Sequence, residues 1–65
     1  MNARHEPQQI LRLKQVLDLV GLSRSTIYSK IASGEFPAPL KLGKRSVGWT
    51  LSSVQQWLTE LQPAR

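Results

Sequence analysis

The 65-residue sequence predicts a mainly α-helical domain with one small β-hairpin, in the order helix, helix, hairpin, helix. Apolar residues recur at helical spacing near both ends of the chain, and glycines separate the helical stretches. A proline-containing stretch with a basic turn lies before the last of them. A chain this short buries roughly 60% of the surface of its unfolded form, so we expect one small core and no separate catalytic domain.

The first helix is expected over residues 13–20. Gly21 follows it, and glycine readily takes the left-handed conformation that ends helices. Leu22 can then fold back onto the core, while Ser23 has the side chain of a helix N-cap. The spacing i, i+3, i+4, i+7 marks one buried face, formed by Leu13, Val16, Leu17 and Val20.

The second helix is expected over residues 24–33, with Gly34 as its terminator. Ile27 and Ile31 lie one turn apart and are its predicted buried anchors. A helix of about ten residues is marginal alone, so it depends on tertiary packing. Phe36, just beyond it, is a candidate aromatic core residue.

A short hairpin should follow, because Pro37 and Pro39 exclude helix and favour extended backbone. Its strands are expected at residues 40–42 and 47–49. The turn between them is basic and consists of Gly43, Lys44, Arg45 and Ser46.

The third helix begins after the hairpin. Either Thr50 is its N-cap, or Ser52 and Gln55 form a capping box. We assign Trp49 and Trp57 to the core, because a small domain needs the large area that tryptophans bury. The residues predicted on the buried face of this helix are Leu51, Val54, Trp57, Leu58 and Leu61.

The predicted domain covers residues 10–62, between a disordered N-terminal arm at 1–9 and a tail at 63–65. No apolar run approaches the ~20 residues of a membrane span, and the first residues lack a signal-peptide layout. A soluble, cytoplasmic and nucleoid-associated bacterial protein is expected. Without cysteine and with only His5, neither a metal site nor a disulfide is expected, and neither is a cofactor or small-molecule ligand.

Two short helices joined by a turn that contains glycine have the layout of a helix-turn-helix, whose second helix enters the DNA major groove. The outward face of the predicted second helix holds small hydroxyl residues, which permit close approach to DNA. Arg24 and Tyr28 border this face, although Tyr28 suits a half-buried core position equally well. The face lacks an acidic residue and consists of Ser25, Thr26, Ser29, Lys30 and Ser33.

The net charge of +5 is concentrated on the second helix and the hairpin. Residues 24–49 hold five basic residues and one acidic residue, whereas residues 1–23 have a net charge of +1 and residues 50–65 a net charge of zero. A hairpin placed beside a recognition helix is a wing, and its basic tip would reach the minor groove or the phosphates. The wing residues assigned to this contact are Lys44, Arg45 and Ser46.

Four motifs in this order resemble the AlpA family of prophage- and island-encoded regulators, which are related to phage excisionases and to the DNA-binding head of MerR proteins. They are LSRSTIY at 22–28, GEFPAPLKLG at 34–43, RSVGW at 45–49 and VQQWL at 54–58. The resemblance covers about residues 11–61 and implies a winged helix-turn-helix. It also implies that Ser25 and Ser29 read the major groove and that Lys44 reaches the minor groove. Better-studied excisionases have larger charged residues at the two serine positions.

The functional hypothesis is a sequence-specific binder of double-stranded DNA that regulates integrase expression, or excision, in a prophage or genomic island. One alternative is an excisionase (recombination directionality factor) that bends attachment-site DNA, and another is a protein-interaction adaptor that inhibits another regulator. Further copies of the chain and integrase are candidate partners. No constellation of catalytic side chains is present, so an enzyme is not expected. The candidate DNA-binding residues are Arg24, Ser25, Thr26, Tyr28, Ser29, Lys30, Lys44, Arg45 and Ser46.

Overall fold

The computed structural model describes residues 9–64, so the expected disorder of residues 1–8 and the end of the tail at Arg65 lie outside it. Within the described residues, three helices and three short strands form a winged helix-turn-helix, which confirms the predicted fold class and adds one strand to it. Their bounds are β1 (Ile10–Leu11), α1 (Leu13–Val20), α2 (Arg24–Ala32), β2 (Leu40–Lys41), β3 (Val47–Thr50) and α3 (Leu51–Thr59).

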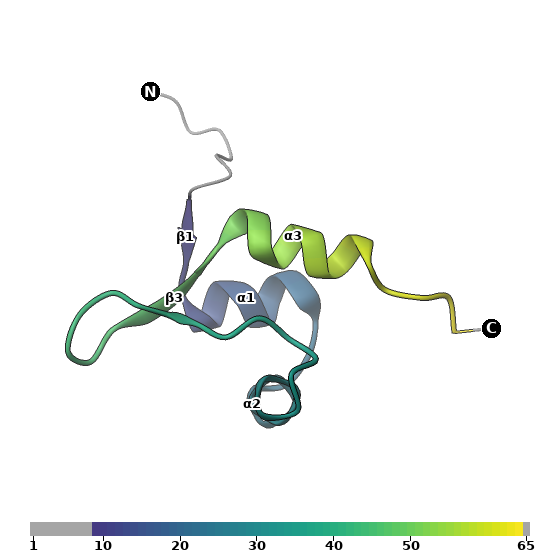
Figure 1. Ribbon diagram of the computed structural model, residues 1–65, viewed down its shortest axis with the longest axis horizontal. Coiled ribbons are helices and arrows are strands. Elements are labelled where there is room, and N and C mark those ends of the chain that lie inside the picture. Colours follow the sequence, from purple (N-terminus) through teal and green to yellow (C-terminus); the bar gives the residue numbers. More distant parts are fainter. Residues whose placement is uncertain (1–8, 65) are drawn as a thin grey trace.

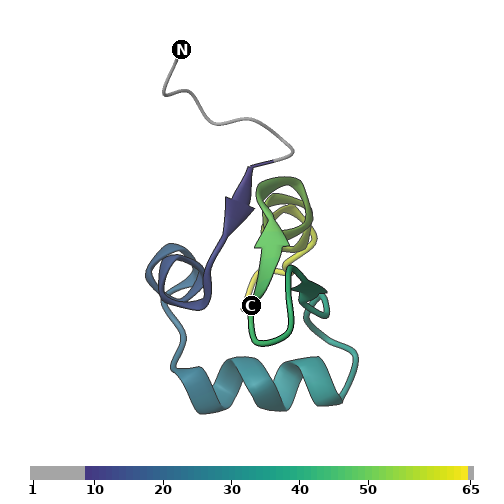
Figure 2. The ribbon, with the colours of Figure 1, turned by 90° about the vertical axis from the view of Figure 1, so that its left-hand side faces the viewer.

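The three helices surround the core from different sides (Figure 1). α1 and α3 run in a similar direction, and α2 runs across them below. The turn between β2 and β3 projects beyond the helices at one end of the long axis, with the C-terminal segment at the other (Figure 1). Figure 2 shows that, among residues 9–64, no other helix or strand covers the lower side of α2. The second helix and the wing are therefore the two outlying parts of the domain.

The sheet has the order β1-β3-β2, with both pairings antiparallel. β1 was not predicted, because a strand of only two residues has no alternation to reveal it. It forms through pairing with β3, in which Leu11 lies opposite Trp49. The Leu51 N–H continues this pairing by donating to the Gln9 carbonyl at 2.7 Å. Gln9, assigned to the arm from sequence, is thus bonded to the start of α3.

The turn between α1 and α2 has the predicted chemistry. Gly21 is left-handed, with φ of 75°, and its N–H donates to the Leu17 carbonyl at 2.8 Å. Ser23 caps α2, because its Oγ accepts from the Thr26 N–H at 3.2 Å. These local bonds set the direction in which α2 leaves α1.

Three residues beyond α2 reverse the chain. α2 ends at Ala32 rather than at the expected Ser33, and Gly34 is left-handed with φ of 81°. The Lys30 carbonyl accepts from the N–H groups of Glu35 at 2.7 Å and Phe36 at 3.2 Å. Backbone bonding to one carbonyl therefore brings Glu35 back beside the last turn of α2.

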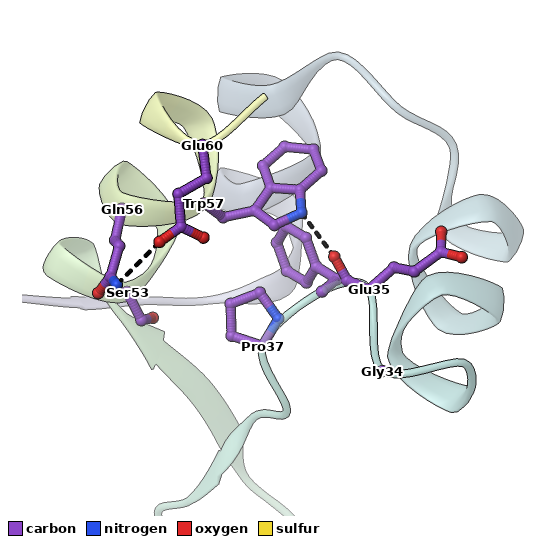
Figure 3. A pocket seen from close by; sticks show the side chains of 8 residues that line it. Gly34, Glu35, Pro37, Ser53, Gln56, Trp57 and Glu60 are labelled. Atoms are coloured by element: carbon purple, nitrogen blue, oxygen red, sulfur yellow. Dashed lines mark hydrogen bonds between the residues drawn. The ribbon is translucent and has the colours of Figure 1, made fainter. Parts of the chain in front are cut away.

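Phe36, Trp49 and Trp57 form what we call the aromatic clamp. Phe36 meets both indoles edge-on, with ring centroids 6.4 Å from Trp49 and 4.8 Å from Trp57. The Trp57 Nε1–H donates to the Glu35 carbonyl at 2.7 Å (Figure 3). The Trp49 Nε1–H donates to the Pro37 carbonyl at 2.8 Å. The clamp thus fixes the loop after α2 to both β3 and α3.

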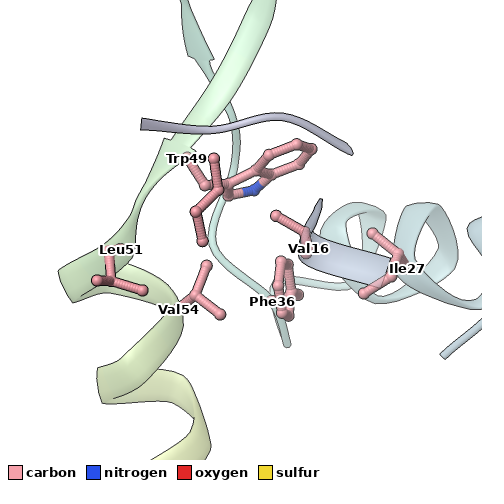
Figure 4. Packing of buried hydrophobic residues seen from close by; sticks show 7 residues of the cluster. Val16, Ile27, Phe36, Trp49, Leu51 and Val54 are labelled. Carbon is pink, nitrogen blue, oxygen red and sulfur yellow. The ribbon is translucent and has the colours of Figure 1, made fainter. Parts of the chain in front are cut away.

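The core takes one or two side chains from almost every element (Figure 4). Ile27 is the buried residue of α2, and the partly buried Ile31 packs against the core, as predicted. β2 contributes nothing, since both of its residues are exposed. Among residues 9–64, the buried apolar side chains are Leu11, Val16, Ile27, Phe36, Trp49, Leu51 and Val54.

The structure decides between the two predicted starts of the last helix and corrects its predicted end. Thr50 is the N-cap, because its Oγ1 accepts from the Ser53 N–H at 3.1 Å, so the alternative capping box at Ser52 is wrong. α3 ends at Thr59, and Leu61 beyond it is 53% exposed instead of buried. The strands also differ slightly, since β2 ends at Lys41 and β3 continues to Thr50.

Gly48 lies in the middle strand, β3, where the neighbouring segments approach too closely to leave room for a side chain. An ideal Cβ there would lie 2.7 Å from Ile10 Cγ2 and 2.9 Å from the Leu11 carbonyl oxygen. A backbone oxygen cannot rotate away as a side chain can. The close approach of β1 to β3 therefore requires glycine at this position.

We predict that Gly48→Ala lowers the free energy of unfolding by about 1–3 kcal/mol, because the added methyl overpacks the sheet. Each kcal/mol should lower Tm by about 4–8 °C in a domain of this size, measured by circular dichroism. Gly43→Ala is the matched control, since its nearest contact is Ser46 Cβ at 4.0 Å and its φ lies outside the left-handed region. An equal loss in both variants would contradict the steric explanation.

Candidate nucleic-acid interface

The outer face of α2 presents most of the residues selected from the sequence. The full burial of Ile27 turns the opposite side of the helix outward. Tyr28 is 45% exposed and is not part of the core cluster, so its side chain lies at the surface rather than in the core. Thr26 and Lys30 are partly buried, and the exposed residues of this face include Arg24, Ser25, Tyr28 and Ser29.

Several hydroxyls on α2 also stabilise its ends. The Ser23 Oγ–H donates to Thr26 Oγ1 at 2.9 Å, and Ser25 Oγ lies 3.4 Å from Ser23 Oγ. At the other end, the Ser33 Oγ–H donates to the Lys30 carbonyl at 3.2 Å. Serine and threonine, which are mediocre helix formers, thus stabilise the ends of this helix through their hydroxyls, and their short side chains project little from its surface.

An open depression of about 470 Å³ lies along this face and includes one acidic side chain. Lys30 Nζ donates to Glu35 Oε1 at 3.4 Å, with 33% of the lysine side chain and 64% of the glutamate side chain exposed. The sequence predicted a face without an acid, which holds for the helix but not for the surface. Because Gly34 reverses the chain, the depression is lined by Ser25, Thr26, Ser29, Lys30, Ser33 and Glu35.

The wing turn is closed by the Ser46 carbonyl, which accepts from the N–H groups of Leu42 at 2.7 Å and Gly43 at 3.2 Å. Lys44 and Arg45 are exposed at its tip, whereas Ser46 is partly buried. The closed turn holds the two basic side chains away from the body of the domain.

Apolar side chains on the wing are also exposed, which sequence reasoning did not anticipate. Leu40 is 50% exposed, Leu42 43% and Val47 38%. Both residues of β2 are exposed, and β3 is exposed at Val47 although Gly48 and Trp49 are buried. The surface of the wing therefore offers both cationic and apolar contacts.

The structure brings the two groups of candidate residues to the same side of the molecule. The wing turn lies above α2 in Figure 2, and Figure 1 shows it extending past α2 along the long axis. Five basic residues belong to α2 and the wing. Lys14 lies apart from them on α1, where its Nζ is 3.6 Å from Asp18 Oδ2. The five are Arg24, Lys30, Lys41, Lys44 and Arg45.

Within residues 9–64, no cluster of three His, Cys, Asp or Glu side chains is arranged to hold a metal ion. In the same residues, no helix combines the length and the apolar character needed to cross a membrane.

Comparison with known proteins places the chain in a family. A family model described as "Prophage CP4-57 regulatory protein (AlpA)" matches residues 9–62. "Uncharacterized protein ORF88" of Enterobacteria phage P4 is 47% identical over 78% of this chain, which spans 58% of that protein. "DNA-binding transcriptional activator AlpA" of Escherichia coli (strain K12) is 36% identical over 80% of this chain and 83% of its own length. The chain therefore belongs to the AlpA family of prophage regulatory proteins.

Proposed function

We propose that this chain is a sequence-specific, double-stranded DNA-binding transcriptional regulator of a prophage or genomic island. The observation that carries the proposal is the concentration of exposed basic and hydroxyl side chains on α2 and the wing. A helix with such a surface fits the major groove, which is about 12 Å wide. The E. coli relative is called a DNA-binding transcriptional activator, which agrees with this assignment.

α2 is the proposed recognition helix. Arg24 extends from its first turn and has the fork geometry that binds guanine O6 and N7. The exposed hydroxyls of Ser25 and Ser29 would donate to base edges or phosphates, and the Tyr28 hydroxyl would contact the DNA backbone. Thr26 would contribute from the N-terminal turn, where the helix dipole attracts phosphate.

The wing supplies the second contact in this proposal. Lys44 and Arg45 would enter the adjacent minor groove or bind its phosphates, with Ser46 at the base of the same turn. Lys41, exposed on β2, adds a further positive charge. Because the two elements border one side of the molecule, they would grip neighbouring grooves of a single duplex.

One copy should bind DNA modestly, since a single small module covers roughly 600–1,000 Å² of protein surface on DNA. We therefore propose further copies on adjacent sites, as well as action on integrase expression or on excision, with integrase as a candidate partner. No enzymatic activity is part of this proposal. Cytoplasmic, nucleoid-associated localisation follows from it.

An excisionase that bends attachment-site DNA would use the same groove contacts. The basic wing favours this candidate, because minor-groove contacts often accompany bending. Circular-permutation electrophoresis on a duplex selected from a random pool separates the two roles. A large bend supports the excisionase, and an unbent complex supports the regulator.

The adaptor hypothesis has a different test. An adaptor would place its basic face on an acidic protein surface, so it would leave both random and selected duplexes unshifted at low salt. Binding to DNA under these conditions would contradict the adaptor as the primary function.

We predict that the logarithm of the DNA association constant falls with the logarithm of salt concentration with a slope of about −4. This slope corresponds to four or five phosphate contacts from α2 and the wing. Fluorescence anisotropy between 50 and 300 mM salt would measure it, and a slope near zero would exclude an electrostatic DNA interface.

We predict that Arg45→Ala weakens DNA binding about five- to tenfold at 0.1 M salt, because one phosphate contact and its released counterion are lost. Tm should change by less than about 3 °C, since Arg45 is an exposed turn residue. Lys14→Ala removes an equal charge from α1 and serves as the control. Equal weakening in the two variants would mean that net charge, rather than the wing, determines binding.

A further inference from the structure

Glu35 is the acidic member of the proposed recognition surface, and it lies at the edge of that surface rather than on α2 itself. Its side chain extends toward α2, whereas the carboxyl group of Glu60 lies beside Gln56 on the far side of Trp57 (Figure 3). An acid so close to residues that would meet phosphate opposes sequence-independent binding. Its position therefore needs an explanation beyond solubility.

The backbone of Glu35 is fixed on both sides. Its N–H donates to the Lys30 carbonyl at 2.7 Å, and its own carbonyl accepts from the Trp57 indole at 2.7 Å. Gly34, left-handed with φ of 81°, provides the reversal that makes this possible. The backbone thus holds Glu35 beside the last turn of α2, and its carboxylate can move only by rotation of the side chain.

The partner of this carboxylate is the lysine at the centre of the depression. Lys30 Nζ lies 3.4 Å from Glu35 Oε1, and only 33% of the lysine side chain is exposed. The Lys14 side chain, in the comparable pair with Asp18, is 87% exposed. Lys30 has less freedom to leave its partner, because most of its side chain is covered by neighbouring atoms.

We propose that Glu35 is a specificity-determining residue, which holds Lys30 away from phosphates and so lowers the affinity for unmatched DNA. The inference rests on the proposed DNA-binding function. A lysine ammonium is a point charge that binds any phosphate, so a free Lys30 would strengthen binding to every sequence. With the Glu35 carboxylate competing, Lys30 exchanges it for DNA only where other contacts bring the lysine close to the duplex. The pair therefore favours matched sites over unmatched ones.

The test compares two fluorescent duplexes, a mixed-sequence 24-bp duplex and a duplex selected from a random pool by the wild-type protein. For Glu35→Gln we expect affinity for the mixed duplex to rise about three- to tenfold at 0.1 M salt. The salt slope on this duplex should steepen by about 0.9, corresponding to one added phosphate contact. Affinity for the selected duplex should rise less, so the ratio of the two affinities falls at least about threefold.

Asp18→Asn is the matched control, because it removes the same charge and also releases a paired lysine, but on α1. It should change both affinities by less than about twofold. Lys30→Gln completes a double-mutant cycle. The factor by which Lys30→Gln lowers affinity for the mixed duplex should be at least about threefold larger in the Glu35→Gln background than in the wild type.

Each outcome has a definite meaning. If Asp18→Asn and Glu35→Gln raise affinity equally, or if Glu35→Gln raises both affinities by the same factor, Glu35 acts only through net charge and the inference is wrong. An additive cycle would likewise overturn it. If the wild type binds neither duplex, the proposed function fails first, which distinguishes the two failures.

Thermal unfolding accompanies the binding measurements. Glu35→Gln retains the backbone N–H and carbonyl that join Lys30 and Trp57, so Tm should change by less than about 3 °C. If this variant unfolds, Glu35→Met provides a second test, since it also removes the carboxylate and keeps the same backbone bonds. A specificity ratio unchanged in a folded Glu35→Met protein overturns the proposal.

Discussion

The insertion of Phe36 between the indoles of Trp49 and Trp57 is the contact on which the arrangement of the domain depends. Each indole N–H also donates to a carbonyl beside this phenylalanine, one at Pro37 and one at Glu35. The loop after α2, strand β3 and helix α3 therefore meet at one point. Since the core has so few other residues, this contact largely determines how α2 is oriented relative to the wing.

In α2, the groups that stabilise the helix differ from those proposed to recognise DNA. α2 is held by one fully buried anchor, Ile27, by the Ser23 cap and by the bonds that its last carbonyls accept. Its exposed side chains are consequently not needed for packing, and serines can stand where a more stable helix would have glutamate or lysine. The exposed face of α2 therefore has small hydroxyl side chains between Arg24 at its start and the Lys30–Glu35 pair near its end, and the wing adds further positive charge.

Local signals in the sequence were sufficient for the helices, the glycine turns and the cap at Ser23, because each depends on residues a few positions apart. Features that depend on distant residues were not predictable in this way. β1 exists only because β3 pairs with it, and Leu61 matched a helical repeat that the end of α3 cuts short. Most of the residues predicted to form the interface are exposed, whereas the sequence alone left the position of Tyr28 open. Glu35 was missed because only the reversal at Gly34 places it beside Lys30.

Thr50 is at once the last residue of β3 and the N-cap of α3, so no loop separates the wing from the last helix. A hinge requires residues whose backbone angles can change, and here those angles are fixed by strand pairing with Ile10 on one side and by the cap on the other. We therefore expect the wing and α3 to move together as one rigid unit. A force applied at the wing tip is transmitted through α3 to Trp57 and from its indole to the Glu35 carbonyl. The wing and the loop that follows α2 are thereby connected through α3 as well as directly along the chain.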